Sequence, residues 1–312
     1  MKRFIVLACG LVSLAASAAI SADGAPPSTA AVQVVDRRAD LTAAQIVEKH
    51  VAARGGLQAW RAVQAMSFNG KMDAGRGDLE ARGARIARGA KARAGKMANG
   101  GTPAGGEKGE ADKQVQLPFL LEMKRPDKSR LEIEFAGKTA LQVYDGTSGW
   151  KLRPYLNRND VEPFTAEEAK SEAEKAGMEG PLVDFAAKGT KVEREGVESV
   201  QGHDAYKLKL TMKSGNVQHV WIDAKSFLDV KVEGTQRRMD GRMRNVWIFQ
   251  RDFRAVQGLM IPFVLETAIE GFPETHKIVI DKVAVNPKLD DTLFNKPAGG
   301  SAAALPAIGA GS

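Results

Sequence analysis

The sequence predicts a mainly β protein with a few short helices, built as one antiparallel sheet of about eleven strands. Apolar and polar residues alternate over many short stretches, as where Leu131, Ile133 and Phe135 are separated by glutamates. Turn pairs such as Asp145-Gly146 separate these stretches at hairpin spacing. Only two or three segments show helical periodicity. With no internal repeat and no sign of a second domain, we expect a single domain over residues 41–297.

The N-terminus has the pattern of an export signal, which we expect over residues 1–22. Lys2 and Arg3 precede an apolar stretch, and small residues follow, so cleavage is expected between positions 18 and 22. The apolar stretch is too short to favour a membrane anchor. Cys9 is the only cysteine and lies inside this signal, where lipid attachment is disfavoured because Leu7 occupies a position that requires a small residue. The exported chain therefore lacks disulfides and thiolate ligands, which suits the periplasm.

The first elements after the signal can be predicted in order. Residues 23–40 are rich in Ala, Pro and Ser and should form a flexible leader. A helix is expected over residues 43–53, capped by Thr42, and a second short helix over 57–63. A first strand should follow over residues 64–72.

Residues 73–113 differ in composition from the rest of the chain. They are rich in Gly, Ala, Lys and Arg and hold almost no large apolar residue, so they cannot bury a core. We interpret them as a basic, disordered and solvated insertion, with contact to an anionic membrane surface as the alternative. Nucleic acid is disfavoured as a partner, because aromatic residues that could stack on bases are missing.

Strands dominate the remainder of the chain. A polar helix is expected over residues 165–177, followed by the run 180–185. We interpret this weak helix between two strands as a surface flap, with an ordinary connection as the alternative. Residues 298–312 should form a flexible tail. The predicted strands span residues 115–123, 128–135, 139–144, a stretch from 150, 191–200, 206–212, 217–223, 228–233, 243–255, 259–269 and 277–285.

The sequence offers little that could carry catalysis. The four histidines lack metal-ligand spacing to one another, so neither a metal nor another cofactor is expected. Ser148 lies in a Gly-Thr-Ser-Gly turn without the glycine two residues before it that a nucleophile elbow needs. The paired acids Glu132 and Glu134 are interpreted as solvated charges. No catalytic residue is assigned, and we expect a protein that is not an enzyme.

The apolar face of the sheet is then the best candidate for a functional surface. A curved sheet of eleven strands has a large concave face, which two or three short helices fill only in part. Such a half-filled sheet could hold acyl chains, since each buried methylene contributes about 0.8 kcal/mol. Leu182 and Phe185 are predicted to act as a lid. The predicted cavity lining comprises Leu131, Ile133, Phe135, Val143, Trp150, Leu208, Leu210, Trp221, Phe249 and Phe263.

The order of several short motifs resembles that of the LolA/LolB-like superfamily, specifically the exported outer-membrane lipoprotein-sorting proteins. The resemblance covers about residues 41–297 apart from the basic insertion. It implies an unclosed antiparallel β-barrel with a helical lid over a hydrophobic cavity, without catalysis; no individual site residue is carried over. The motifs are Gly55-Gly56 with Trp60 and Val63, the run 125–132, Tyr144-Asp145-Gly146 with Gly149-Trp150, the run 180–185, the run 202–208, Gly258-Leu259-Met260-Ile261-Pro262 and the run 286–294.

The residues and the resemblance together predict a monomeric periplasmic carrier or chaperone. It would bind acyl chains of lipoproteins or a related lipid for transport toward the outer membrane. The first alternative is a regulatory module on the same scaffold that senses lipid or lipoprotein. The second is an enzyme, such as a hydrolase that uses Ser148.

Overall fold

The computed structural model describes residues 41–73, 115–173, 175 and 177–298. All of them belong to one compact unit, Arg37–Ser312. The predicted signal and leader, nearly all of the basic insertion and almost all of the C-terminal tail lie outside the described residues. No described helix is both long and apolar enough to cross a membrane.

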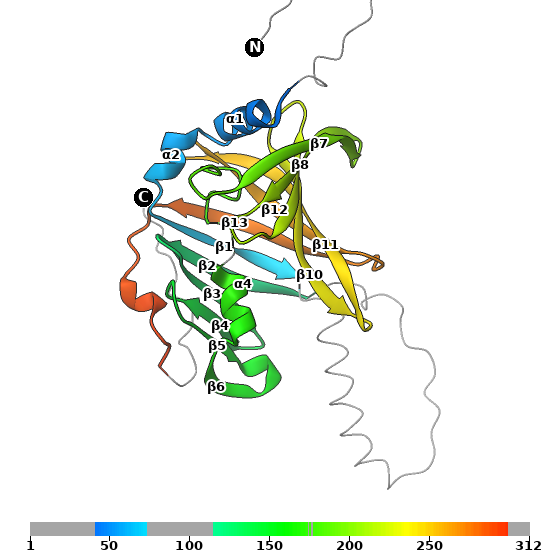
Figure 1. Cartoon of the computed structure of the whole chain (residues 1–312). Coiled ribbons are helices and arrows are strands. Elements are labelled where there is room, and N and C mark those ends of the chain that lie inside the picture. The colour runs from blue at the N-terminus through cyan, green and yellow to red at the C-terminus, as the bar shows by residue number, and fades with distance from the viewer. Residues whose placement is uncertain (1–40, 74–114, 174, 176, 299–312) are drawn as a thin grey trace, which may run out of the picture. The chain divides into compact units, whose positions relative to one another are not determined.

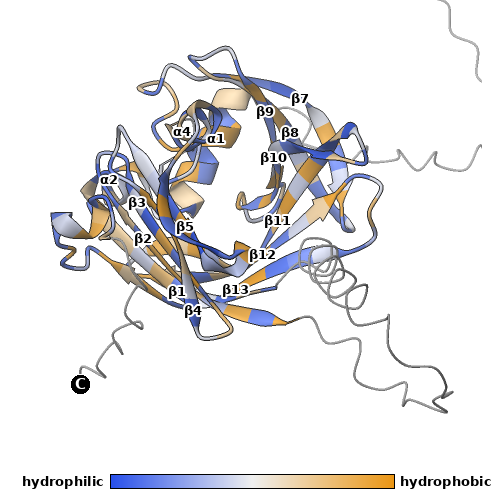
Figure 2. Ribbon diagram, turned by 90° about the horizontal axis from the view of Figure 1, so that it is seen from below, coloured by the Kyte–Doolittle hydropathy of each residue, from blue (hydrophilic) through white to orange (hydrophobic). Residues whose placement is uncertain are grey.

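The described strands form one antiparallel sheet of thirteen strands in the order β6-β5-β4-β3-β2-β1-β13-β12-β11-β10-β9-β8-β7. Figure 2 shows the strong curvature of this sheet. The expected fold, a mainly β chain with an open antiparallel sheet, is confirmed. The strands are β1 (Ala65–Asp73), β2 (Gln116–Lys124), β3 (Lys128–Phe135), β4 (Lys138–Tyr144), β5 (Gly149–Arg153), β6 (Arg158–Pro163), β7 (Lys191–Val200), β8 (His203–Thr211), β9 (Val217–Asp223), β10 (Asp229–Met239), β11 (Arg242–Val256), β12 (Leu259–Ile269) and β13 (Thr275–Val285).

The two edge strands of the sheet are β6 and β7, and a single connection, residues 164–190, joins them. It contains α4 (Ala166–Ala173), which follows Thr165 as predicted; Glu168 N donates to Thr165 Oγ1 at 3.2 Å. We call residues 177–190 the crossing segment. Its adjacent residues Leu182 and Val183 are both buried, each in a different hydrophobic cluster on the concave side of the sheet.

The helices α1 (Ala43–Ala53) and α2 (Leu57–Ala62) precede the sheet and pack on it (Figure 1). As predicted, Thr42 caps α1 in a reciprocal capping box with Gln45. Arg54, between the helices, is buried and donates to Asp229 at 2.9 Å and to the Met260 carbonyl at 2.9 Å. The helix pair is thereby fixed to β10 and β12.

Two apolar clusters fill much of the concave side. The first joins α1 to β8 and β9, and the second joins α2 to β1, β2, β12 and β13. Their buried members are Ile46, Val47, Leu182, Tyr206, Leu208, Leu210, Val220, Ile222 and Ala224 in the first, and Trp60, Val63, Met66, Phe119, Val183, Leu259, Ile261, Phe263 and Ile280 in the second.

A third cluster lies on the opposite, convex face, where the C-terminal segment crosses β4 and β5. The 3-10 helix η3 (Asp291–Phe294) places Phe294 there with no exposed surface. Phe294 packs with Leu141, Val143 and Leu152. The outer side of these strands is therefore dry as well, because the chain end covers it.

Candidate ligand-binding site

Several of the predicted lining residues lie on the concave face. Residues directly opposed across an antiparallel pair project from the same side of a sheet. Leu131 opposes Leu121, and Ile133 opposes Phe119, which belongs to the cluster around α2. Phe135 shares their face by alternation. Leu208, Leu210 and Phe263 are buried in the two concave clusters.

Four predicted lining residues lie on the convex face and cannot line the same cavity, which corrects the expected set. On β4, Gln142 opposes Leu131, so its neighbour Val143 projects outward, together with Trp150 opposite it on β5. Likewise Val220 opposes Leu208 on the concave side, so Trp221 projects outward. Phe249 also projects outward, because Lys231 opposes both Trp221 and Phe249.

Trp221 takes part in a polar-aromatic cluster rather than in a lipid-like surface. Its indole Nε1 donates to Glu198 at 2.7 Å, and Lys231 Nζ lies 3.9 Å from the ring centroid. Burial lowers the pKa of Lys231, and the negative charge of Glu198 acts against this lowering. We interpret this cluster as outer packing of the β7–β11 half of the sheet.

A hollow of about 400 Å³ opens on the concave side, between the β2–β3 turn, α4, the crossing segment and the β8–β9 turn. Its lining combines charged side chains with apolar ones, among them three methionines, Met123, Met178 and Met212. Methionine is flexible and polarisable, so such a wall can adapt to different chain shapes. The remaining lining residues are Lys124, Arg125, Pro126, Asp127, Lys128, Ser129, Tyr144, Glu172, Ala173, Lys175, Gly177, Glu179, Pro181, Lys188, Thr190, Lys213 and Ser214.

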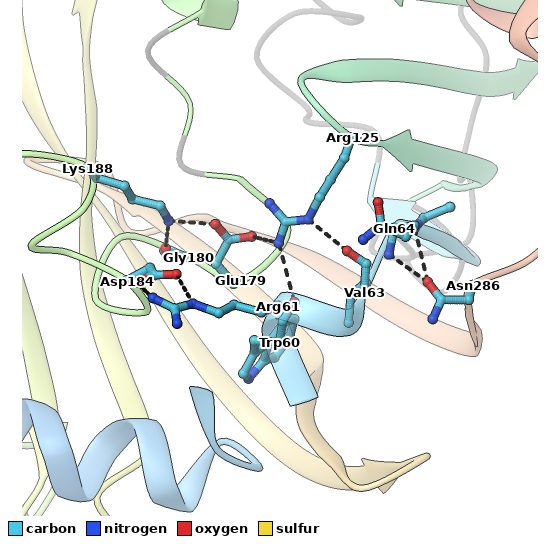
Figure 3. A network of polar contacts seen from close by, with 11 residues as sticks. Trp60, Arg61, Val63, Gln64, Arg125, Glu179, Gly180, Asp184, Lys188 and Asn286 are labelled. Carbon is cyan, nitrogen blue, oxygen red and sulfur yellow. Dashed lines mark hydrogen bonds and ion pairs between the residues drawn. The ribbon is translucent and has the colours of Figure 1, made fainter. Parts of the chain in front are cut away.

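Arg125 lies at the wall of this hollow and bonds to α2 and the crossing segment (Figure 3). Its Nε donates to the Val63 carbonyl at 2.7 Å, and its Nη2 donates to the Trp60 carbonyl at 3.3 Å. The same Nη2 lies 2.9 Å from Glu179 Oε2. One guanidinium thus satisfies two helix-end carbonyls and one carboxylate.

Glu179 connects Arg125 to Lys188, whose Nζ lies 2.7 Å from Glu179 Oε1. Lys188 Nζ also donates to the Gly180 carbonyl at 2.8 Å, within the crossing segment. The Glu179 side chain is 5% exposed. Burial alone would raise its pKa, but the hydrogen bond and charge of Lys188, with the charge of Arg125, hold the pKa below its ordinary value. Glu179 is therefore an ionised, buried link.

A second polar contact closes the crossing segment onto α2. Arg61 donates twice to Asp184, at 2.7 Å for each bond. The Arg61 hydrogen bond lowers the pKa of Asp184, and the bidentate geometry fixes the direction of the segment after Val183. We call Arg61, Arg125, Glu179, Asp184 and Lys188 the polar latch.

The polar latch lies between two hollows. Arg125, Glu179 and Lys188 line both the 400 Å³ hollow and a second of about 310 Å³, which also includes Trp60 and Asp184. These three side chains therefore belong to the walls of both hollows.

The predicted lid residues lie in the crossing segment. Leu182 is 1% exposed and belongs to the cluster around α1, on which Phe185 also packs. Sequence reasoning missed the polar latch itself. Arg125 and Asp184 both lie in motifs that support the family resemblance, but which charges would meet depends on a contact across the sheet that no local pattern encodes.

The described residues provide no group of three or more His, Cys, Asp or Glu side chains that could hold a metal ion. Ser148 lies in the β4–β5 turn, where its backbone N–H donates to Asp145 Oδ1 at 2.7 Å. Its place in that turn is structural, as in an Asx turn.

No protein-family model and no curated protein matches the sequence. The fold is similar to that of several solved structures. A LolA superfamily protein from Nitrosomonas europaea matches with a TM-score of 0.47 and 16% identity over 82% of this chain and 98% of the other. A putative outer membrane lipoprotein-sorting protein domain from Vibrio parahaemolyticus matches with a TM-score of 0.47 and 13% identity, over 80% of this chain and 95% of the other. A DUF1329 family protein from Desulfovibrio piger matches with a TM-score of 0.48 and 14% identity, over 81% of this chain and 97% of the other.

These similarities concern the fold and transfer no activity at such identities. This chain is thus similar in structure to LolA superfamily and lipoprotein-sorting proteins.

Proposed function

We propose that the protein is a periplasmic carrier that binds acyl chains of lipoproteins or a related lipid on the concave side of its sheet. The observation that carries this proposal is the hollow of about 400 Å³ beneath the crossing segment, whose lining includes Met123, Met178 and Met212. Its volume lies in the range of small-molecule sites. An apolar chain would gain about 0.8 kcal/mol for each methylene that it buries there.

The crossing segment supports a gated form of binding. Leu182 and Val183 occupy the two concave clusters and are each 1% exposed. An acyl chain that displaces them would replace one apolar contact by another, so the exchange is nearly neutral for the clusters. The polar latch then sets the cost of opening. In this mechanism Leu182 and Phe185 act as a lid, and Leu131, Ile133, Phe135, Leu208, Leu210 and Phe263 form the deeper wall.

Binding can be tested with a fluorescent fatty acid and with native mass spectrometry of the purified chain. The informative variant is Met212→Asp, which places a charge in the hollow and should weaken binding at least about tenfold. Met243→Asp is the matched control, because Met243 is 53% exposed and does not line the hollow. The control should bind like wild type.

The proposal is overturned if the wild-type protein neither takes up the probe nor co-purifies with a lipid. It is also overturned if Met212→Asp binds as tightly as Met243→Asp while both remain folded by circular dichroism, since the hollow would then not be the binding site.

A further inference from the structure

The β10–β11 hairpin extends beyond the strands on both of its sides. β9 pairs with β10 only as far as Val232, and β12 pairs with β11 only as far as Val246. Within the described part of the chain, residues 237–244 therefore form a two-stranded ribbon without a third strand beside it, at the free end of the two yellow strands in Figure 1. At about 3.4 Å per residue, its turn stands clear of the sheet.

This ribbon is strongly basic. It contains four arginines, at 237, 238, 242 and 244, against one acid, Asp240. Arg237, Arg238 and Arg242 are exposed. Among the described residues, no ion pair or hydrogen bond engages the side chains of these three arginines. Their charges are consequently available to an anionic partner.

The fourth arginine orients the ribbon instead. Arg244 lies over the Phe272 ring at 5.9 Å, and its Nη1 would be 3.3 Å from a Cβ at Gly271. Both partners belong to the β12–β13 turn. The contact holds the base of the ribbon in place. Arg237 lies opposite Arg244 at this base, and Arg238 and Arg242 lie nearer the tip.

Exposed apolar side chains accompany these charges. Met243 is 53% exposed within the ribbon, and Val217 is 49% exposed at the start of β9, which neighbours β10. Arginine combined with exposed apolar groups suits the head-group region of a bilayer, where cations meet lipid phosphates and apolar side chains enter the acyl boundary.

We propose that the ribbon formed by residues 237–244 docks on the surface of an anionic phospholipid bilayer. β9 runs antiparallel to β10, so the β8–β9 turn lies at the same end of the strands as the ribbon. Met212 and Lys213 in that turn also line the 400 Å³ hollow. Docking would therefore bring one wall of the hollow toward the membrane. The surface itself does not depend on what the hollow binds.

The test is flotation of the mature protein with vesicles of phosphatidylcholine, with or without phosphatidylglycerol. Arg237→Gln with Arg242→Gln should reduce partition onto the anionic vesicles about 25-fold, since each cation near such a surface contributes about fivefold. The matched control is Lys225→Gln with Lys288→Gln, which removes the same charge from exposed positions beyond the opposite ends of β9 and β13. Every variant keeps the basic stretch 73–113, so its contribution is constant.

The control should bind anionic vesicles like wild type, and wild-type binding should weaken with added salt and be absent on phosphatidylcholine alone. The proposal is overturned if wild type fails to bind anionic vesicles. Equal losses in the two double variants would also overturn it, because net charge rather than the ribbon would then govern binding. Thermal melts of both double variants are the check that each is folded.

Discussion

At the scale of single residues, substitution of Arg125 should have a large effect on stability. It bonds to two carbonyls of the α2 region and to the buried carboxylate of Glu179. Arg125→Gln should lower the free energy of unfolding by about 2 kcal/mol, since it leaves a buried charge with one partner fewer. Urea unfolding measures the loss. Arg158→Gln is the control: its contact with Glu162 is exposed, so it should cost under about 0.5 kcal/mol.

The same variant tests gating. If the latch sets the cost of opening, Arg125→Gln should also take up a fluorescent fatty acid faster than wild type and Arg158→Gln. Slower uptake by Arg125→Gln, or an equal rate in all three proteins, would show that the polar latch does not control access to the hollow.

Glu179 adds a pH dependence with a defined sign. Its folded pKa lies below the ordinary value of 4.5, so the folded state favours the ionised form. The resulting stabilisation is complete above pH 4.5 and is lost as the pH falls through the folded pKa. Wild type should therefore lose stability on acidification below pH 4.5. In Glu179→Gln, stability should depend less steeply on pH in this range. Urea midpoints at a series of pH values measure it, and an unchanged slope in the variant would contradict the assignment.

At the scale of elements, a substitution in the crossing segment should change stability and acyl-chain affinity in opposite directions. Leu182→Ala should cost about 3 kcal/mol of stability because Leu182 is fully buried. It should nevertheless increase acyl-chain affinity, because it frees space where a chain would lie. Leu208→Ala, in the same cluster but on β8, should cost similar stability without the gain in affinity. Equal affinities for the two variants would show that the crossing segment does not compete with ligand.

The elements also show how far sequence reasoning reaches. The capped helix α1, the strand β9 and the strand β12 were predictable, because Thr42 and the alternating apolar residues define them locally. β6 was missed, since Arg-Asn-Asp-Val-Glu-Pro shows no alternation and its pairing with β5 is what orders it. Alternation divides each strand into two faces without saying which face is concave. The outward placement of Val143 and Trp221 follows only from registers that the turns and bulges determine.

At the scale of the whole domain, binding should appear as stabilisation. A ligand that binds only the folded state at 100 times its dissociation constant adds about 2.7 kcal/mol. For a domain of this size, that corresponds to an increase of about 5–10 °C in melting temperature. Differential scanning fluorimetry of the delipidated protein with and without a long-chain fatty acid measures the shift. At the same fatty-acid concentration Met212→Asp, which should bind at least about tenfold more weakly, should show at most about half of this shift.

The open seam between β6 and β7 has one more consequence. In a closed barrel the number of strands sets the bore, and widening it requires breaking the hydrogen-bonded ladder. Here the ladder ends at both edge strands, which residues 164–190 connect along the chain. The edges can move apart by a change of sheet twist with every ladder hydrogen bond intact. If the protein is the carrier proposed above, the concave space is therefore adjustable, and cargoes of different bulk are accommodated at the expense of side-chain packing and of the polar latch.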